Sequence, residues 1–386
     1  MKVAYISPVY FSDVDMSLLP YLQGKVKLDY YLQVTKNVHK FAAIDINRLN
    51  DSNGVIPIAT YTELNHLGNL ISSNNSFIVN NNCNLYSLKS FVCGFKLFIK
   101  IAKSKYDIIH LTEFPHIHEF FLYLLRKKIV LTVHDPFPHS SVKSKSISFR
   151  RWLAFKLIKK FIILNESQKE EFLRINNIER ENVFDSKLSC YDYLHIYDKR
   201  LNKKENQNYI LFFGQITSHK GVDDLLEAME EVHKKHDTVK LIVAGKWKWD
   251  FDYSKYEGLD YIEIINRFIP DFELAMLIKY SKFVVVPYHD ATQSGVIMSA
   301  FAFDKPCIAT NVGGLPEMVI HNKFGIIIPP KDVDSLVISI CELLESKELL
   351  EVYSNNIYMK YHYKESILSW NFISNQIIDI YKKVLK

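Results

Sequence analysis

Two loops in the second half of the chain combine lysine, serine and glycine in patterns that bind phosphate. In FFGQITSHKGVDDLLEAM (212–229), Gly214 ends an apolar run and Lys220-Gly221 stands immediately before an amphipathic helix pattern. A lysine beside a tight glycine turn can direct its ammonium at a phosphate held over the ends of the strands. The alternative is an ordinary solvent-exposed lysine in a loop.

The second loop is DATQSGVIMSAFAF (290–303), in which the flexible pair Ser294-Gly295 begins a helix after the apolar run KFVVVPY. The first amides of a helix have no intrahelical acceptor and carry about half a positive charge, so they bind phosphate well. Gly295 allows a ligand to approach the backbone closely. The alternative is that Thr292 or Ser294 is an N-cap whose side chain satisfies these donors.

Two further loops carry polar residues at the ends of expected strands. In ATNVGGLPEMV (309–319), Gly313-Gly314 precedes Glu317 in the first turn of a helix. A tight turn with a favourable N-terminal acid explains this pattern equally well. In TVHDPFPHS (132–140), His134-Asp135 ends a strand. His134 is a candidate catalytic residue, and a structural histidine is the alternative.

Several common cofactor and nucleophile motifs are absent from the sequence. No GxGxxG follows a first strand, and neither a GxxxxGK[ST] P-loop nor a GxSxG elbow occurs. The five cysteines are scattered without CxxC spacing, so we expect neither a disulfide framework nor a zinc site. His116 and His118 have no partnering cluster of ligands. We therefore expect no metal site and no cofactor.

The whole-chain composition is that of an ordinary globular protein. The chain has 386 residues, of which 48% are hydrophobic and 24% charged, and this length suggests two or three domains. No apolar run reaches the roughly 18 to 20 residues that span a bilayer, and no signal-peptide pattern is visible, so we expect a cytoplasmic protein. The net charge is +9 for residues 1–190 and −4 for residues 191–386. The basic half favours an anionic lipid or a phosphorylated partner, and we expect no nucleic acid because no nucleic-acid-binding motif is present.

Strand-like runs alternate with helical patterns along the chain, which predicts an α/β protein with parallel sheets. In the first half the expected strands are 2–7, 76–81, 107–112, 128–134 and 160–166. In the second half they are 209–214, 239–245, 261–268, 282–288, 306–310 and 324–330. The polar segment 197–208 is expected to join the two series. We therefore predict an N-terminal domain at 1–196, a C-terminal domain at 197–362 and a final helix at 363–386.

A helix is also predicted over 91–103. Phe91, Phe95, Phe98 and Ala102 recur at spacings of three and four, which predicts that this stripe packs on the core. The lysines at 96, 100 and 103 lie on the opposite face. Together with FRRWLAFKLIKKF (149–161), this face suggests peripheral contact with an anionic membrane that carries a lipid-linked glycan. A solvated helix face is the alternative.

Taken together, three segments resemble the retaining glycosyltransferases of family 4. They are FFGQITSHKGVDDLLEAM, VVVPYHDATQSGVIMSAFAFDKPCIATNVGGLPEMV and TVHD. The likeness is most specific within residues 209–330, and Ser369-Trp370 also resembles the family, whose last helix crosses back onto the N-terminal domain. The resemblance implies the GT-B fold, in which two Rossmann-like, doubly wound parallel-sheet domains face a central cleft. It also implies that the second domain holds a nucleotide sugar and the first holds the acceptor.

The resemblance assigns roles to individual residues. Lys220 would contact the donor diphosphate, and the backbone from Ser294 to Val296 would cradle its distal phosphate. The segment 267–269 would hold the base, and His134 would lie near the donor sugar. The predicted catalytic residues are His134, Lys220 and Asp290. The predicted donor-binding residues are Gly214, Gln215, Lys220, Arg267, Phe268, Ile269, Gln293, Ser294, Gly295, Val296 and Ser299.

The chain departs from the family pattern at several positions. Gln215 stands where the family usually has an arginine, so one positive charge on the diphosphate is missing. The family's pair of glutamates falls on Ala291 and Ser299. Ser299 could hydrogen-bond a ribose hydroxyl, and Asp290 or Gln293 could contact the sugar instead. The glycine pair usual after the first strand is absent from SPVYFSDVD.

These features predict the transfer of a sugar from a UDP- or GDP-linked donor to a hydroxyl of a glycan or lipid-linked glycan. The expected transfer retains the anomeric configuration, needs no metal, and serves the synthesis of a bacterial surface polysaccharide. Stabilising a departing diphosphate beside an oxocarbenium-like centre calls for preorganised donors and cations rather than a covalent nucleophile. The alternatives are a non-catalytic nucleotide-sugar-binding subunit of a transferase complex, and a GT-B epimerase or phosphorylase. The sequence predicts no particular oligomeric state.

Overall fold

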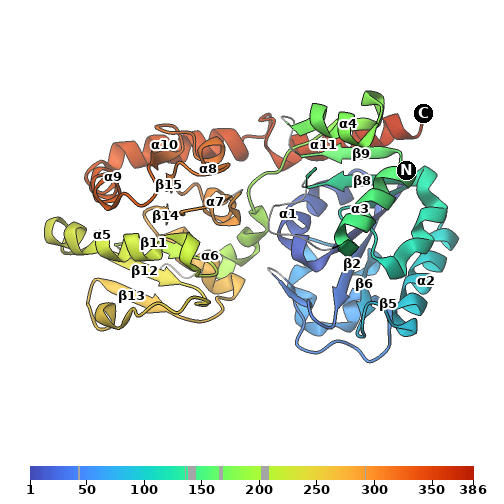
Figure 1. The fold of residues 1–386 in the computed structure, drawn as a ribbon, viewed down its shortest axis with the longest axis horizontal. Helices are drawn as coiled ribbons and strands as arrows, with labels where there is room; N and C mark the ends of the chain where they lie inside the picture. Colours follow the sequence, from blue (N-terminus) through green and yellow to red (C-terminus); the bar gives the residue numbers. More distant parts are fainter. Residues whose placement is uncertain (42–43, 135, 138–144, 165–167, 201–207, 292) are drawn as a thin grey trace. The chain divides into compact units, whose positions relative to one another are not determined.

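The computed structural model divides the chain into two compact units, each with its own sheet (Figure 1). One unit consists of Met1–Leu188 and Trp370–Lys386, and the other of Ser189–Ser369. The limits predicted from the sequence, at 196/197 and 362/363, differ from these by several residues and stay a prediction. The structure describes the whole chain except residues 42–43, 135, 138–144, 165–167, 201–207 and 292.

The first unit is built around an eight-stranded sheet in the order β10-β9-β8-β7-β1-β2-β6-β5. Neighbouring strands are parallel except β5 and β6, which are antiparallel. A separate antiparallel ladder pairs β3 with β4. The strands are β1 Lys2–Pro8, β2 Lys27–Thr35, β3 Lys40–Phe41, β4 Ile44–Asp45, β5 Gly54–Pro57, β6 Ser76–Asn81, β7 Ile108–Leu111, β8 Ile129–Val133, β9 Lys160–Ile163 and β10 Val183–Asp185.

The sequence predicted five of these strands, β1, β6, β7, β8 and β9, but missed the central strand β2. β2 pairs with β1 from Lys2↔Lys27 to Pro8↔Gln33. Its run KLDYYLQVT is interrupted by Asp29 and Gln33, and these polar residues obscure the apolar pattern of a buried strand. In the sheet the Asp29 carboxylate accepts a hydrogen bond from the Tyr106 hydroxyl, so the partly buried charge has a partner.

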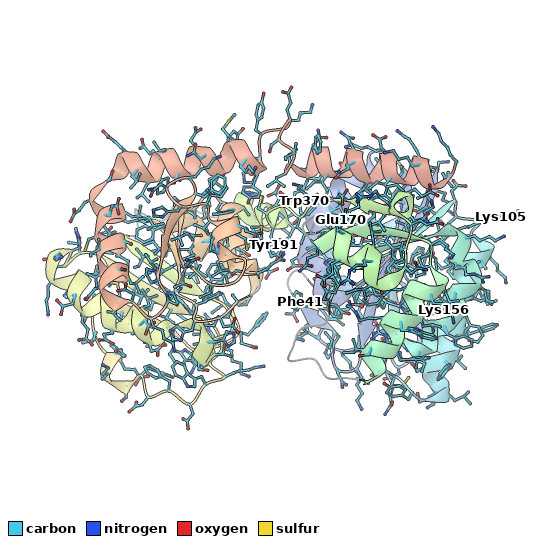
Figure 2. The ribbon with its side chains drawn as sticks, turned by 45° about the horizontal axis from the view of Figure 1, so that its top comes forward. Phe41, Lys105, Lys156, Glu170, Tyr191 and Trp370 are labelled. Carbon is cyan, nitrogen blue, oxygen red and sulfur yellow. The ribbon has the colours of Figure 1, made fainter. Side chains whose placement is uncertain are left out.

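Helices flank this sheet, and the last helix of the chain is one of them (Figure 1). α11 packs against α1 and opens with the buried Trp370, which is labelled in Figure 2. The Tyr381 hydroxyl of α11 lies 2.6 Å from His110 Nδ1 on β7. The expected return of the C-terminal helix to the N-terminal unit is therefore confirmed. The helices of this unit are α1 Ser12–Gln23, α2 Leu88–Lys103, α3 Lys145–Leu157, α4 Lys169–Asn176 and α11 Trp370–Val384.

The helix predicted over 91–103 is present as α2, but the predicted buried stripe is wrong. The face that packs on the core carries Cys93, Leu97 and Ile101, whereas Phe95 is largely exposed. Both stripes repeat with helical periodicity, so the sequence pattern cannot distinguish them. Gly94 decides between them, because a Cβ there would lie 1.9 Å from the His118 carbonyl oxygen. The backbone of the 3-10 helix Ile117–Lys128, which contains His118, therefore packs directly on the side of α2 that carries Gly94.

The second unit contains a six-stranded sheet in the order β13-β12-β11-β14-β15-β16, and all its pairs are parallel. All six strands confirm runs predicted from the sequence. They are β11 Tyr209–Phe213, β12 Lys240–Ala244, β13 Ile262–Ile265, β14 Val284–Val286, β15 Cys307–Thr310 and β16 Gly325–Ile328. The helices are α5 Val222–Lys235, α6 Asp271–Tyr280, α7 Gly295–Phe301, α8 Leu315–Met318, α9 Val333–Glu345 and α10 Lys347–Tyr361.

Short 3-10 helices occupy several connections. They are Val9–Phe11, Ile58–Thr60, Thr62–Asn69, Ser73–Asn75, Ile117–Lys128, Arg180–Asn182, Asp192–Arg200, Ser218–Lys220 and Ser254–Tyr256. Among the described residues, no helix combines the length and the apolar character that crossing a membrane requires.

Candidate functional site

The strand order of the second unit brings the two predicted phosphate-binding loops together. β11 lies between β12 and β14, so the chain leaves β11 toward one edge of the sheet and returns beside it to build the other half. Ligands of open parallel sheets bind beyond the carboxyl ends of the strands at such a reversal point. The loop after β11 contains Lys220, and the loop after β14 leads to Ser294. The backbone amide of His289 donates to the carbonyl of His219 at 2.8 Å, which joins the two loops directly.

Lys220 places its ammonium over an aromatic ring at this point. Lys220 Nζ lies 3.6 Å from the centroid of the Tyr288 ring, and the Tyr288 side chain is buried. A cation held against a ring face is stabilised by the ring quadrupole. Burial of the half-buried lysine lowers its pKa to about 8. The Lys220 side chain has no ion pair or hydrogen bond with any residue that the structure describes, so its charge is available to an anionic ligand.

Gly221 allows the two loops to approach each other. Its φ of +62° lies in the left-handed region, and a Cβ at this position would lie 1.9 Å from the Pro287 carbonyl oxygen. An amino acid with a side chain would be strained in this backbone conformation and would clash with this carbonyl, so only glycine fits at this position. The glycine that follows Lys220 in the sequence pattern therefore fixes the spacing between the lysine and the loop that carries Tyr288.

The helix start at Ser294 is open rather than capped by its own side chain. Ser294 occupies the N-cap position of α7, but its side chain makes no capping hydrogen bond. For Ser294 the N-cap alternative is therefore wrong, and Thr292 lies outside the described residues. The hydroxyl of Ser294 is buried next to that of Tyr288, while Gly295 is exposed. The first amides of α7 have no intrahelical acceptor. A Cβ at Gly295 would lie 3.4 Å from the Tyr191 ring.

The other predicted donor-binding residues occupy different surroundings. Gln215 is exposed in the loop after β11, as are Asp290 and Gln293 in the loop after β14. Gly214 ends β11 with a φ of +117°, and a Cβ there would lie 3.4 Å from a methyl group of Val296. The structure thus places Gly214, Gln215, Asp290, Gln293 and Val296 around the reversal point.

Four of the predicted donor-binding residues lie in surroundings that fit their predicted roles less directly. Ser299 is buried on the body of α7 rather than at its start. Arg267 follows β13, the edge strand of the sheet, and its guanidinium pairs with Glu273 at 2.6 and 2.8 Å. Phe268 is 61% exposed and Ile269 is half-buried. Because the Arg267 guanidinium is paired with Glu273, the segment 267–269 offers a ligand its backbone and the Phe268 ring rather than a free charge.

Sequence reasoning missed two side chains that support the site. Tyr288 supplies the ring under Lys220, and its carbonyl accepts a hydrogen bond from Thr310 Oγ1 at 2.5 Å. His289 lies 2.7 Å, Nε2 to Oδ2, from Asp224 on the first turn of α5. No spacing rule connects these residues, because the strand order alone places them together. The contact between His289 and Asp224 ties the loop after β14 to α5, the helix that follows Gly221.

Comparison with known proteins assigns part of the chain to a protein family. Residues 195–360 match the family model "Glycosyl transferases group 1". This region belongs to the group 1 glycosyltransferase family. An uncharacterized glycosyltransferase of Methanocaldococcus jannaschii is 26% identical over 309 residues, which cover 73% of this chain and 76% of the relative. The expected family resemblance is therefore confirmed.

Two solved structures share the fold of this chain over nearly its whole length. Anabaena HepE in complex with UDP matches with a TM-score of 0.62 at 16% identity, covering 98% of this chain and 99% of that one. UDP-GlcNAc 2-epimerase of Neisseria meningitidis, bound to UDP-GlcNAc, matches with a TM-score of 0.66 at 13% identity, with coverages of 98% and 99%. The predicted GT-B fold class is confirmed. At identities of 13% and 16%, this likeness concerns the fold and not the reaction.

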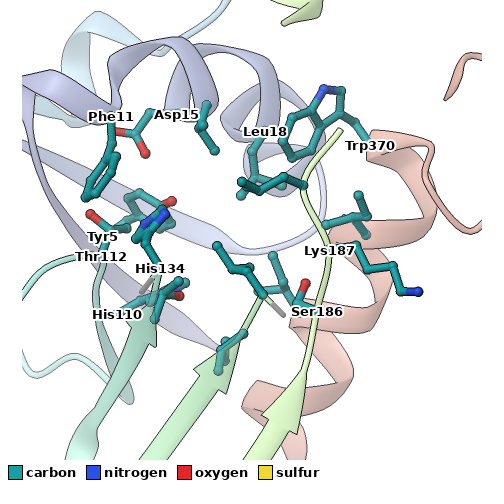
Figure 3. A pocket seen from close by; sticks show the side chains of 17 residues that line it. Tyr5, Phe11, Asp15, Leu18, His110, Thr112, His134, Ser186, Lys187 and Trp370 are labelled. Atoms are coloured by element: carbon teal, nitrogen blue, oxygen red, sulfur yellow. The ribbon is translucent and has the colours of Figure 1, made fainter. Parts of the chain in front are cut away.

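The first unit contains a second group of polar residues around a small cavity. The cavity has a volume of about 30 Å³ and lies beyond the carboxyl ends of the central strands (Figure 3). His134 follows β8, and its ring stacks on Phe11 with centroids 3.8 Å apart. Asp15 also lines the cavity; it is fully buried, and this burial raises its pKa to about 7 although Tyr30 donates a 2.9 Å hydrogen bond to it. Asp135, the residue after His134, lies outside the described residues.

A neutral histidine lies beside this cavity. Burial lowers the pKa of His110 to about 3. Its Nδ1 lies 2.6 Å from the Tyr381 hydroxyl and its Nε2 lies 2.7 Å from Thr132 Oγ1. With both ring nitrogens engaged, His110 is a structural residue that joins α11 to the strands. His134 is the histidine of this pair that the sequence singled out for a role in catalysis.

Among the residues that the structure describes, two groups of side chains in the second unit have ligand atoms close enough to share a metal ion. In each group the ligand atoms lie within 4.8 Å of one another. One group is formed by Asp223, Asp224 and His289 beside the lysine loop. The other is formed by Cys190, Asp192 and His362. The sequence predicted neither, because their members come from separate segments of the chain.

Proposed function

We propose that the protein transfers a sugar from a nucleotide diphosphate sugar to an acceptor hydroxyl with retention of configuration. The family match of residues 195–360 supports the nucleotide-sugar class. The observation that carries the proposal is the half-buried Lys220 ammonium, which faces the reversal point of the sheet without an acidic partner among the described residues. A departing diphosphate supplies the negative charge that this lysine lacks.

In this proposal catalysis is electrostatic. The Lys220 ammonium and the amides at the start of α7 stabilise the charge that develops on the diphosphate as the glycosidic bond to the donor breaks. No covalent nucleophile takes part, and the reaction needs no metal ion. Gln215 contributes no charge where the family usually has an arginine, so Lys220 carries a larger share of the stabilisation.

The remaining predicted residues complete the proposed donor site. Segment 267–269 holds the base, and Ser299 serves the ribose. Asp290 and Gln293, both exposed in the loop after β14, contact the transferred sugar. His134 hydrogen-bonds a hydroxyl of that sugar or steadies the forming positive charge. UDP and GDP are the candidate leaving groups, and the UDP bound by the Anabaena neighbour favours UDP.

A thermal-shift screen of nucleotide diphosphates and their sugars tests the donor assignment. A ligand that binds only the folded state at a hundred times its Kd adds about 2.7 kcal/mol to the free energy of unfolding. We expect UDP or GDP to raise the Tm of the wild-type chain and to have a much smaller effect on Lys220→Ala. If no nucleotide raises the Tm, or if the two chains respond alike, the assignment of the diphosphate to Lys220 is wrong.

Product analysis separates the proposal from its alternatives. A transferase forms a new glycoside only when an acceptor is present. An epimerase, the activity of the Neisseria neighbour, changes the donor sugar without an acceptor, and a phosphorylase needs free phosphate. A non-catalytic binding subunit binds the donor and leaves it unchanged. The departures at Gln215, Ala291 and Ser299 make this last alternative worth testing with the purified chain alone.

The pH dependence of nucleotide binding offers a second test. Because the pKa of Lys220 is lowered to about 8, the lysine is charged below pH 8 and loses its proton as the pH rises further. A bound diphosphate raises that pKa again, so the Kd should increase about tenfold per pH unit from pH 8 upward until the pKa of the complex is reached. Isothermal titration of UDP between pH 7 and 10 measures this slope. Lys220→Arg, which stays charged, should remove the slope.

We further propose that the acceptor is a glycan or a lipid-linked glycan of a bacterial surface polysaccharide and that the protein works at the cytoplasmic face of the membrane. We place the proposed membrane contact on the aromatic face of α2 rather than on its lysine face, because the aromatic face is exposed. An exposed apolar patch covers α2 and the 3-10 helix 117–128, which pack together. The patch consists of Leu88, Val92, Phe95, Phe120 and Leu124.

This patch has the composition of an interfacial membrane anchor. Leu88 is 81% exposed and Leu124 is 67% exposed, so two leucines on neighbouring helices face the solvent. Exposed basic residues lie on the same two helices, at Lys89, Lys103, Arg126 and Lys127. An apolar surface bordered by cations matches the acyl boundary and the headgroups of an anionic bilayer.

Sedimentation with vesicles tests this contact. We expect the wild-type chain to sediment with vesicles that contain anionic lipid, and Phe95→Glu combined with Leu124→Glu to lower the bound fraction about tenfold, because charges replace buried apolar contacts. Ile338→Glu is the matched control, since Ile338 is an exposed isoleucine of the other unit. Equal sedimentation of all three chains would show that the patch does not bind membranes.

A further inference from the structure

A groove in the first unit lies apart from the cavity beside His134. It opens beyond the carboxyl ends of β2 and β6, and its volume is about 410 Å³. This volume falls within the range of about 300 to 1,000 Å³ that ligand pockets occupy. The carboxyl ends of parallel strands are also where ligands of open sheets bind. The lining residues are Thr35, Lys36, Asn37, Cys83, Asn84, Leu85 and Tyr86.

The walls of the groove are held in place by hydrogen bonds. On one side, Thr35 and Val38 bond to each other through both backbone amides, at 3.0 and 3.1 Å. On the other side, the Asn84 side-chain oxygen accepts from the Tyr86 amide at 2.9 Å. The Lys36 amide donates to the Asn81 carbonyl at 3.2 Å and so joins the two walls. A groove that is already shaped loses little conformational entropy when a ligand binds.

Asn81 anchors this groove to the interior. Its side chain is buried, donates to Ser90 Oγ at 2.8 Å and accepts from the Cys83 thiol at 2.9 Å. These bonds satisfy the buried amide, so that Asn81 supports the groove floor without taking part in binding. Three other lining residues, Lys36, Asn37 and Asn84, are different in kind, because they are exposed and have unused hydrogen-bonding capacity.

The exposed lining has the chemistry of a sugar-binding surface. The side chains of Lys36 and Asn37 make no hydrogen bond or ion pair with any described residue. The side-chain amide nitrogen of Asn84 is likewise without a hydrogen bond within the described part of the chain. Together they offer an ammonium and two amides, which can donate to and accept from neighbouring hydroxyls. Tyr86 adds a ring that is 65% exposed, a flat apolar surface for the C–H face of a sugar. No acidic residue lines the groove.

We propose that this groove is an acceptor subsite that binds one saccharide unit of the glycan. The assignment rests on the proposed transferase function, which requires a glycan acceptor, and adds a location and a set of contacts. Tyr86 stacks on the sugar ring, while Asn37, Asn84 and Lys36 hydrogen-bond its hydroxyls. The groove belongs to the basic half of the chain, where the acceptor is expected.

Saturation-transfer NMR with methyl glycosides tests the subsite. The probes are methyl glucoside, methyl glucuronate and the methyl glycoside of N-acetylglucosamine, each at millimolar concentration with the full chain. We expect transfer to the ring protons of at least one probe, and a reduction of at least fivefold in Tyr86→Ala. Tyr358→Ala is the matched control, because Tyr358 is an exposed tyrosine of the other unit. It should leave the signal unchanged.

Two results would overturn the subsite. One is the absence of transfer to every probe, and the other is an equal signal in the wild-type chain and Tyr86→Ala. The melting transition, recorded with and without UDP or GDP on the same samples, shows that each variant is folded. It also separates the two proposals: a chain that binds a glycoside through Tyr86 but no nucleotide contradicts the donor assignment, whereas a nucleotide shift without glycoside binding contradicts only the subsite.

Discussion

Replacing Lys220 with alanine is expected to lower kcat/KM for sugar transfer by about 10²- to 10³-fold, the loss typical of removing one preorganised group that stabilises developing charge. The ammonium is held 3.6 Å from the Tyr288 ring centroid and has no acidic partner among the described residues. Its charge therefore serves the ligand rather than the fold. The loss should appear mainly in kcat, because the charge on the leaving diphosphate grows in the transition state.

A second lysine of the same unit supplies the matched control. Lys255 Nζ also lies over a tyrosine ring, 4.5 Å from the centroid of Tyr256, but it is exposed and paired with Glu230 at 3.6 Å. Lys255→Ala should leave the transfer rate within about twofold of the wild type, since an exposed ion pair contributes about 0 to 1 kcal/mol. Initial rates with the donor identified by the thermal-shift screen measure both variants. A Lys220→Ala chain that folds and transfers at the wild-type rate would remove the lysine from the mechanism.

Replacing Gly221 with alanine is expected to lower the free energy of unfolding by about 3 kcal/mol, the combined effect of a left-handed backbone and an overpacked contact. The new Cβ would lie 1.9 Å from the Pro287 carbonyl oxygen, so the backbone of one loop must move. Pro287 precedes Tyr288, and the movement should also displace the ring under Lys220. Nucleotide affinity is therefore expected to fall together with stability.

The two parts of this effect can be separated within the same unit. Gly258 also has a positive φ, +85°, but a Cβ there would meet no atom within 4 Å. Gly258→Ala should cost only the backbone strain of about 1 kcal/mol and leave nucleotide binding unchanged. Urea denaturation and UDP titration compare the variants. Equal losses of stability at both glycines would show that the loop contact at Pro287 has no energetic consequence.

The sequence predicted the second unit well because its signals are local. Each of its six strands is a short apolar run, and glycines or prolines stand close to the ends of several of them. Gly214 and Gly221 mark the loop after β11 for the same reason. The lysine and the helix start could therefore be selected as candidate phosphate ligands without a structure.

The first unit was harder to predict because two of its features depend on partners far along the chain. β2 carries Asp29 inside a buried run, where its carboxylate accepts a hydrogen bond from the Tyr106 hydroxyl and pairs with Lys2 Nζ at 3.6 Å. In α2, the two apolar stripes are equivalent by periodicity. The contact of the His118 carbonyl with Gly94 selects the stripe of Cys93 and Leu97, and leaves the phenylalanines at the surface.

The amino-acid sequence by itself determined the α/β class, the strands of the second unit and the choice of candidate phosphate-binding loops, because periodicity, glycine and helix starts act over a few residues. The tertiary structure decided which loops meet. The order β13-β12-β11-β14-β15-β16 sets Lys220 on the Tyr288 ring beside Ser294, and it leaves Arg267 paired with Glu273 at the edge strand. Strand order depends on packing between distant segments, and no local pattern encodes it.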